Sequence, residues 1–156
     1  MRHRPIREFM SADFLRVRPD TPVRGAQQLM RSANMRDLVV MEGERLAGVL
    51  SQLDLYIIQS LSGADPESAV VEEAMAPHPY VVGPEAPVQE VARTMWKERC
   101  GSAVIVDQEK VIGIFTIFDA LHALSQVVSP EHDDDQEADA VTVGESHPNE
   151  SRNAGA

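Results

Sequence analysis

The amino-acid sequence predicts an α+β fold in which two copies of one β-α-β-β-α unit pack sheet to sheet around a pseudo-two-fold axis. The first observation behind this prediction is that the phrase GVLSQLD, which begins at Gly48, returns as GIFTIFD at Gly113, 65 positions later. The same shift aligns Met10 with Met75 without a gap. Such self-similarity indicates an internal repeat. The second observation is that strand and helix periodicities follow in the same order in both copies.

The repeat divides the chain into two units of similar length. We place the first copy at residues 8–61 and the second at 73–126, joined by a linker at 62–72 that is rich in turn residues. One copy alone would leave one face of its sheet bare, so we expect the two sheets to pack against each other. Residues 130–156 carry eight acidic residues against the single Arg152, a composition typical of a disordered tail.

Each copy begins with a short extended segment followed by a helix. FLRV at 14–17 and YVV at 80–82 are the extended segments. Proline then marks a turn, and we expect Pro22 and Pro87 at the first position of each helix, where the missing N–H costs nothing. Thr21 is a candidate cap for the first helix. Apolar residues recur at helical spacing after each proline, so both helices are expected to bury one face.

Two apolar runs and a second helix complete each copy. LVVM and LAGVL are separated by the polar EGER at 42–45, and AVIVD and VIGIF by QEK at 108–110. Polar turns between β-branched runs predict antiparallel hairpins. After Ser51 and Thr116, the stretches LDLYIIQSL and FDALHALSQV have helical periodicity.

Composition and charge exclude several classes of protein. The chain has 156 residues, a net charge of −11 and one cysteine, Cys100. An acidic protein is not expected to bind nucleic acid, because neutralisation of phosphates by basic residues supplies most of that affinity. No apolar run approaches the roughly 20 residues that cross a bilayer, and no apolar stretch follows the basic N-terminus as in a secretory signal. We therefore expect a cytoplasmic protein that binds neither nucleic acid nor membrane. No catalytic motif is present, so we do not expect an enzyme.

The repeated phrase places a hydroxyl and a carboxylate together at the start of a helix. Ser51 with Asp54, and Thr116 with Asp119, are each three residues apart. The unpaired amides of a helix N-terminus favour anions such as phosphate. A carboxylate only accepts hydrogen bonds, which suits the two hydroxyls of a ribose. The same pattern is also close to a capping box, in which both side chains bond to the backbone. The two interpretations are compatible.

Residues 8–126 resemble a tandem pair of cystathionine-β-synthase (CBS) domains, a Bateman module, which we expect to be stand-alone. The resemblance rests on the order of elements, the paired turns PDTPV and PEAPV, the hairpin, and the closing Gly-x-x-Ser/Thr-x-x-Asp phrase. It implies a module that binds adenosine-type ligands in clefts between the repeats. It also implies a homodimer formed through helix faces, which would regulate an effector protein.

The resemblance further implies which residues line the two clefts. The first cleft would combine Thr116, Asp119 and Ile114 with Leu15, Met35 and Arg36 of the other copy. The second would combine Ser51, Asp54 and Val49 with Tyr80, Cys100 and Gly101. Because Arg36 offers a phosphate partner and Gly101 does not, we expect a charged nucleotide in the first cleft.

The sequence departs from the family pattern just before each aspartate. Members that bind phosphates well often carry a basic residue there, whereas this chain has Leu53 and Phe118. The departure favours AMP or ADP over ATP and leaves S-adenosylmethionine possible as a ligand; no cofactor is required. Two alternatives stay open. One is a ligand-free dimerisation or interaction scaffold, and the other is a regulator that responds to divalent cations or redox state through residues 131–135 or Cys100.

Overall fold

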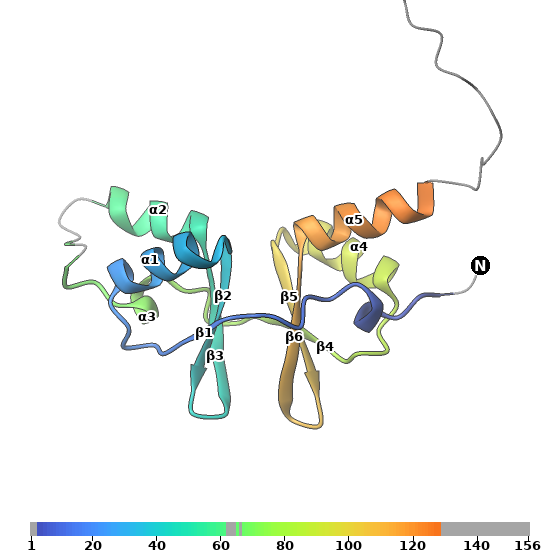
Figure 1. Cartoon of the computed structure of the whole chain (residues 1–156), viewed down its shortest axis with the longest axis horizontal. Helices are drawn as coiled ribbons and strands as arrows, with labels where there is room; N and C mark the ends of the chain where they lie inside the picture. Colours follow the sequence, from blue (N-terminus) through green and yellow to red (C-terminus); the bar gives the residue numbers. More distant parts are fainter. Residues whose placement is uncertain (1–2, 62–64, 66, 129–156) are drawn as a thin grey trace, which may run out of the picture.

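Two three-stranded sheets face each other at the centre of the molecule (Figure 1). The computed structural model describes residues 3–61, 65 and 67–128. In each sheet a short strand pairs in parallel with the first strand of an antiparallel hairpin, giving the orders β1-β2-β3 and β4-β5-β6. The helices lie on the outer faces, so the predicted α+β architecture with sheet-to-sheet packing is confirmed.

Both repeats follow the predicted order of elements. The elements of the first repeat are β1 (Arg16–Val17), α1 (Val23–Ala33), β2 (Asp37–Glu42), β3 (Arg45–Ser51) and α2 (Gln52–Ser60). Those of the second are β4 (Tyr80–Val82), α4 (Val88–Glu98), β5 (Ser102–Asp107), β6 (Lys110–Thr116) and α5 (Ile117–Val128). A short 3-10 helix, η1 (Ile6–Glu8), precedes β1, and one helical turn, α3 (Val71–Ala74), precedes β4.

The helices α1 and α4 start one residue later than predicted. Pro22 and Pro87 occupy the N-cap positions with extended backbone, and neither helix has a side-chain cap. The Thr21 hydroxyl accepts a hydrogen bond from the amide of Arg18 at 3.1 Å, so it stabilises the preceding turn. The prediction that Thr21 caps α1 was therefore wrong, because the local turn competes for the same hydroxyl.

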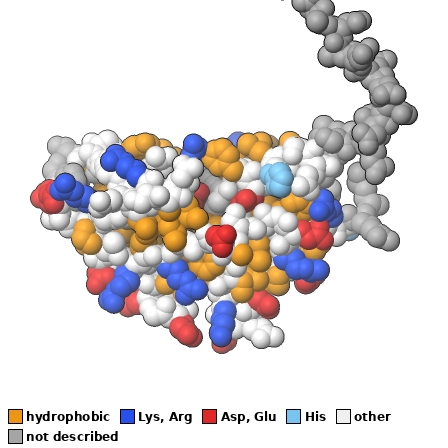
Figure 2. All heavy atoms as spheres, viewed as in Figure 1, with side chains coloured by type: hydrophobic (Ala, Val, Ile, Leu, Met, Phe, Trp, Pro, Cys, Tyr) orange, Lys and Arg blue, Asp and Glu red, His pale blue; other side chains and the backbone are white. Residues whose placement is uncertain are grey.

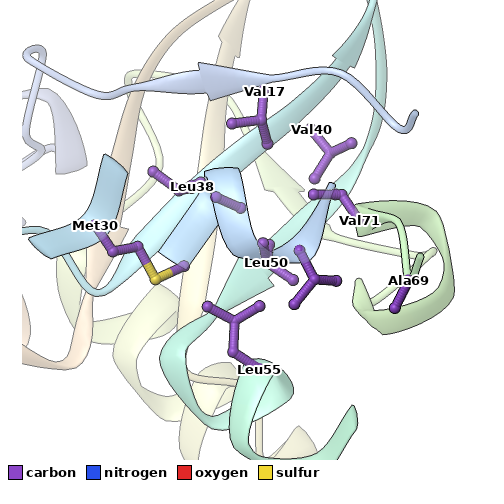
Figure 3. Packing of buried hydrophobic residues seen from close by; sticks show 10 residues of the cluster. Val17, Met30, Leu38, Val40, Leu50, Leu55, Ala69 and Val71 are labelled. Atoms are coloured by element: carbon purple, nitrogen blue, oxygen red, sulfur yellow. The ribbon is translucent and has the colours of Figure 1, made fainter. Parts of the chain in front are cut away.

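Three apolar clusters hold the fold together. One lies between the first sheet and its helices and includes Leu38, Leu50 and Leu55 (Figure 3). Its counterpart in the second repeat includes Phe115 and Ile105. The third cluster joins the two sheets and consists of Val39, Met41, Val49, Val104, Val111 and Ile114. The third cluster is the burial that the sheet-to-sheet prediction required.

The segments that lead into the repeats are exchanged between the two cores. Ile6 and Phe9, which precede β1, pack in the core of the second repeat, and the Ile6 amide donates to the carbonyl of Ala86 at 2.8 Å. Conversely, Val71 packs in the first core, and its amide donates to the carbonyl of Thr21 at 2.8 Å. The sequence repeats and the packing units therefore differ at their edges, and each repeat completes the other.

Some predicted segments lie outside the described residues. These are the acidic tail at 130–156 and linker positions 62–64 and 66. Within the described part of the chain, every helix is too short or too polar to cross a membrane.

Candidate functional site

Ser51 and Asp54 bind each other through the backbone at the start of α2. The Ser51 hydroxyl accepts from the Asp54 amide at 3.1 Å, and the Asp54 Oδ2 accepts from the Ser51 amide at 2.8 Å. The pair is a complete capping box. Since this arrangement occupies one oxygen of the carboxylate, the other is available as an acceptor.

Thr116 and Asp119 make the same arrangement at the start of α5, with two additional hydrogen bonds. Oδ2 of Asp119 accepts from the Thr116 amide at 2.8 Å and from the Thr116 hydroxyl at 3.2 Å. Its Oδ1 accepts from the hydroxyl of Ser11 at 3.2 Å. Both oxygens of Asp119 therefore have protein donors, one of them a hydroxyl from the other end of the chain.

The surroundings of Asp54 and Asp119 differ because different residues, Ala76 and Ser11, pair with the strands that precede them. Ser11 exchanges backbone hydrogen bonds with Ile114, and Ala76 does the same with Val49 in the equivalent place. Ala76 has no hydroxyl to offer Asp54. The Ser11 contact was missed from the sequence, where only the alignment of Ser11 with Ala76 hints at this asymmetry.

Arg36 reaches from the first repeat to the site of Thr116 and Asp119. Its guanidinium lies 4.7 Å from the ring centroid of Phe118, the residue next to Asp119. The Arg36 carbonyl accepts from the amide of Gln52, the first residue of α2, at 2.8 Å. The backbone of Arg36 is thus bonded to the start of α2, while its guanidinium lies over the start of α5.

A cavity of about 320 Å³ opens between α1 and α2. Its lining includes Met35 and Arg36, two of the residues expected in the first cleft, and the side chains of Gln27, Arg31, Gln52 and Tyr56. The other residues predicted for the clefts do not line this cavity. The hollow lies on the helix side of the first repeat, whereas the clefts were predicted between the repeats.

The remaining predicted residues take positions that differ in accessibility. Ile114 and Val49 are buried between the sheets, while Leu15 and Tyr80 are partly buried against the cores of their own repeats. Cys100 and Gly101 follow α4, and the Gly101 carbonyl accepts from the Ile117 amide at 3.2 Å. Among the described residues no hydrogen bond joins Tyr80, Cys100 or Gly101 to Ser51 or Asp54.

Cys100 does not have the features of a reactive thiol. It is partly buried, and this burial raises the pKa of its thiol above the ordinary value. A raised pKa reduces the thiolate, which is the reactive form. Within the described residues no group of three His, Cys, Asp or Glu side chains is arranged to hold a metal ion, and residues 131–135 lie outside them.

Asp37 is a third carboxylate at the boundary of the repeats, which the sequence did not single out. It begins β2 and pairs across the hairpin with Ser51, the cap of α2. Burial raises the pKa of Asp37 to about 6, with further contributions from the charges of Asp54 and Asp119, which Arg36 opposes. Asp37 therefore adds a carboxylate beside the start of α2, and its neighbour in sequence, Arg36, lies over Phe118 at the start of α5.

Comparisons with known proteins agree with this architecture. The family model described as "CBS domain" matches twice, at residues 6–59 and 71–126. Hypoxic response protein 1 of Mycobacterium tuberculosis is 27% identical over 127 residues, which cover 81% of this chain and 85% of that protein. Inosine-5'-monophosphate dehydrogenase of Korarchaeum cryptofilum is 29% identical over 115 residues, which cover 73% of this chain but only 23% of the enzyme.

Solved structures show the same fold. The crystal structure of CBSX2 in complex with AMP matches with a TM-score of 0.68 and 26% identity, covering 79% of this chain and 97% of that one.

Proposed function

The chain belongs to the CBS domain family, and on this basis we propose that it is a cytoplasmic regulatory module that senses an adenine nucleotide or related adenosyl compound. AMP or ADP is the favoured ligand, and S-adenosylmethionine is an alternative. The observation that carries the proposal is the matched pair of aspartates, Asp54 and Asp119, at the starts of α2 and α5. The complex of CBSX2 with AMP supports an adenosine ligand for a similar pair of repeats.

The aspartates bind ribose in this proposal, and the helix N-termini receive the phosphate. Each carboxylate is held in place by a backbone amide, so it is oriented before the ligand arrives. Asp54 offers its free oxygen to a ribose hydroxyl. At Asp119 a ribose hydroxyl replaces the Ser11 hydroxyl, an exchange of one neutral donor for another.

We assign the charged nucleotide to the cleft of Thr116 and Asp119, with Ile114, Leu15 and Met35 around the base. The position of Arg36 over Phe118 supports this assignment, because the guanidinium is within reach of a phosphate bound at the start of α5. The second cleft, with Ser51, Val49, Tyr80, Cys100 and Gly101, has no such cation and suits an uncharged adenosyl group.

The molecule acts without catalysis in this proposal. A ligand that prefers one arrangement of the repeats shifts the module toward that arrangement, and an effector protein responds to the shift.

We also propose that the protein is a homodimer, because α2 and α5, the last helix of each repeat, expose large apolar side chains. Those on α2 are Leu53, Tyr56 and Ile57, and those on α5 are Ile117, Phe118, Leu121 and Leu124, each more than half exposed. Figure 2 shows hydrophobic side chains along the edge of the molecule where these helices lie. A shared apolar face of this kind favours an interface between copies of the chain.

A thermal-shift assay with AMP, ADP, ATP, NAD and S-adenosylmethionine tests the ligand proposal. A ligand at 100 times its dissociation constant stabilises the folded state by about 2.7 kcal/mol. We expect the largest shift with AMP or ADP. No shift with any of the five would favour a ligand-free dimerisation scaffold, for which the exposed helix face is the supporting observation.

A further inference from the structure

Asp37 breaks the symmetry of the two repeats at the boundary between them. It lies directly across the hairpin from Ser51, and side chains of such a cross-strand pair share one face of the sheet. The equivalent pair in the second repeat is Ser102 with Thr116. A carboxylate therefore stands beside the start of α2, where the other repeat has only a hydroxyl.

Three elements from both repeats bring negative charge to this place. Asp37 comes from β2, Asp54 from α2 and Asp119 from α5. The charged groups that act on Asp37 are these two aspartates and Arg36, the sole cation among them. Arg36 adjoins Asp37 in the sequence, is exposed, and places its guanidinium over Phe118 at the start of α5.

This charge distribution matters for a ligand that carries phosphate. Charges that lie partly inside a protein interact more strongly than charges in water. A phosphate at the start of α5 is attracted by Arg36 and by the helix amides, and it is repelled by the ionised carboxylates. Asp119 is required to hold the ribose of this ligand, whereas Asp37 makes no such contact in the proposed site. The charge of Asp37 can therefore change the affinity for phosphate without removing a contact to the ribose.

We propose that Asp37 is a specificity-determining residue, which lowers the affinity of the site for anionic adenosyl ligands relative to uncharged ones. The inference rests on the proposed function. The ionised Asp37 penalises each additional phosphate, so it favours adenosine or AMP over ATP. Burial is the main cause of the raised pKa of Asp37, about 6, and the charges of Asp54 and Asp119 add to it.

The test compares AMP with adenosine at pH 7.5 by isothermal titration calorimetry. The wild type is measured beside Asp37→Asn and Asp37→Ser, the second of which installs the residue of the other repeat. Asp107→Asn is the control, because Asp107 is exposed at the far end of β5. The pH is fixed because a phosphate monoester itself titrates near pH 6.

Both Asp37 variants are expected to bind AMP about tenfold more tightly, which corresponds to one pKa unit of interaction. Their affinity for adenosine is expected to stay within about twofold of the wild type. The control should change neither. Equal changes for AMP and adenosine, or no change for either, would overturn the role of Asp37 while leaving the sensing function intact. If no protein bound AMP or adenosine, the proposed function would fall, and this inference with it.

Discussion

Met75 packs directly on Gly48, across the boundary of the repeats. A Cβ added to Gly48 would lie 2.8 Å from the Met75 Sδ and 2.5 Å from the carbonyl oxygen of Ala76. Met10 lies on Gly113 in the same way, and a Cβ there would be 2.7 Å from its Sδ. The glycine that leads each repeated phrase is therefore needed for close approach by the segment that enters the other repeat.

Gly48→Ala and Gly113→Ala are each expected to lower the free energy of unfolding by about 1–3 kcal/mol. At Gly48 the carbonyl of Ala76 must move to admit the methyl group, and at Gly113 the Met10 side chain must move. Chemical denaturation measures the change. Gly25→Ala is the matched control. It lies in α1, where the nearest contact of an added Cβ is 3.7 Å, and alanine there should stabilise by about 0.5–1 kcal/mol. Equal effects at all three positions would contradict the close approach.

The stability of the protein should depend on pH through Asp37. Its pKa is about 6 in the folded protein and ordinarily 3.8. Protonated Asp37 therefore favours folding fully below pH 3.8, and this contribution is lost as the pH rises through 6. The shift corresponds to about 3 kcal/mol at most, and solvent screening of this partly exposed group lowers it to about 1–2 kcal/mol.

Asp37→Asn should accordingly raise the free energy of unfolding at pH 7.5 and have little effect near pH 4. Urea denaturation of both proteins across this range measures the difference. A gain that is the same at every pH would show that the charge of Asp37 is not its cause.

The carboxylates of Asp54 and Asp119 should also stabilise their helices. Asp54→Ala leaves the Ser51 amide without its acceptor, and Asp119→Ala does the same to the Thr116 amide. Each loss is expected to cost about 0.5–2 kcal/mol, the usual range for a helix cap. Thermal unfolding monitored by circular dichroism checks this prediction, and an unchanged melting temperature in both variants would refute it.

Much of the fold could be predicted from the repeat, because the helical and strand periodicities follow in the same order in both copies and each predicts one helix or strand. The sequence could not show that Ile6 and Phe9 enter the opposite core, since both cores offer similar apolar surfaces and only tertiary packing distinguishes them. Thr21 was wrongly predicted as the cap of α1 because two roles compete for its hydroxyl, a helix cap and a turn bond to Arg18.

The candidate site was predicted unevenly for a related reason. The capping pairs lie within three residues of each other, so the sequence revealed them. The charge of Asp119 affects the pKa of Asp37 only after the two repeats have packed, and Ser11 reaches Asp119 across 108 positions of the chain. Contacts of this range leave no local pattern. The fit of Tyr80, Cys100 and Gly101 around a ligand stays a prediction.

The exposed face of α5 should mediate dimerisation. Leu121→Glu with Leu124→Glu replaces two leucines that are each 56% exposed. Burying one leucine stabilises an interface by roughly 1.5–3 kcal/mol, so the double variant should weaken the dimer by about 100-fold or more. Sedimentation velocity across a concentration series measures this. Val81→Glu is the control, since Val81 is 45% exposed but lies on β4. A dimer that survives the α5 changes would place the interface elsewhere.

Calorimetric titration of AMP into the wild type, Asp119→Ala and Asp54→Ala tests the central claim most directly. Both variants lose one helix cap, so a difference between them reports on the ligand. We predict that the wild type binds AMP, that Asp119→Ala loses at least about tenfold in affinity, and that Asp54→Ala retains most of it. Undiminished AMP binding by Asp119→Ala, with loss of binding in Asp54→Ala, would contradict the assignment; no binding by the wild type would contradict the function.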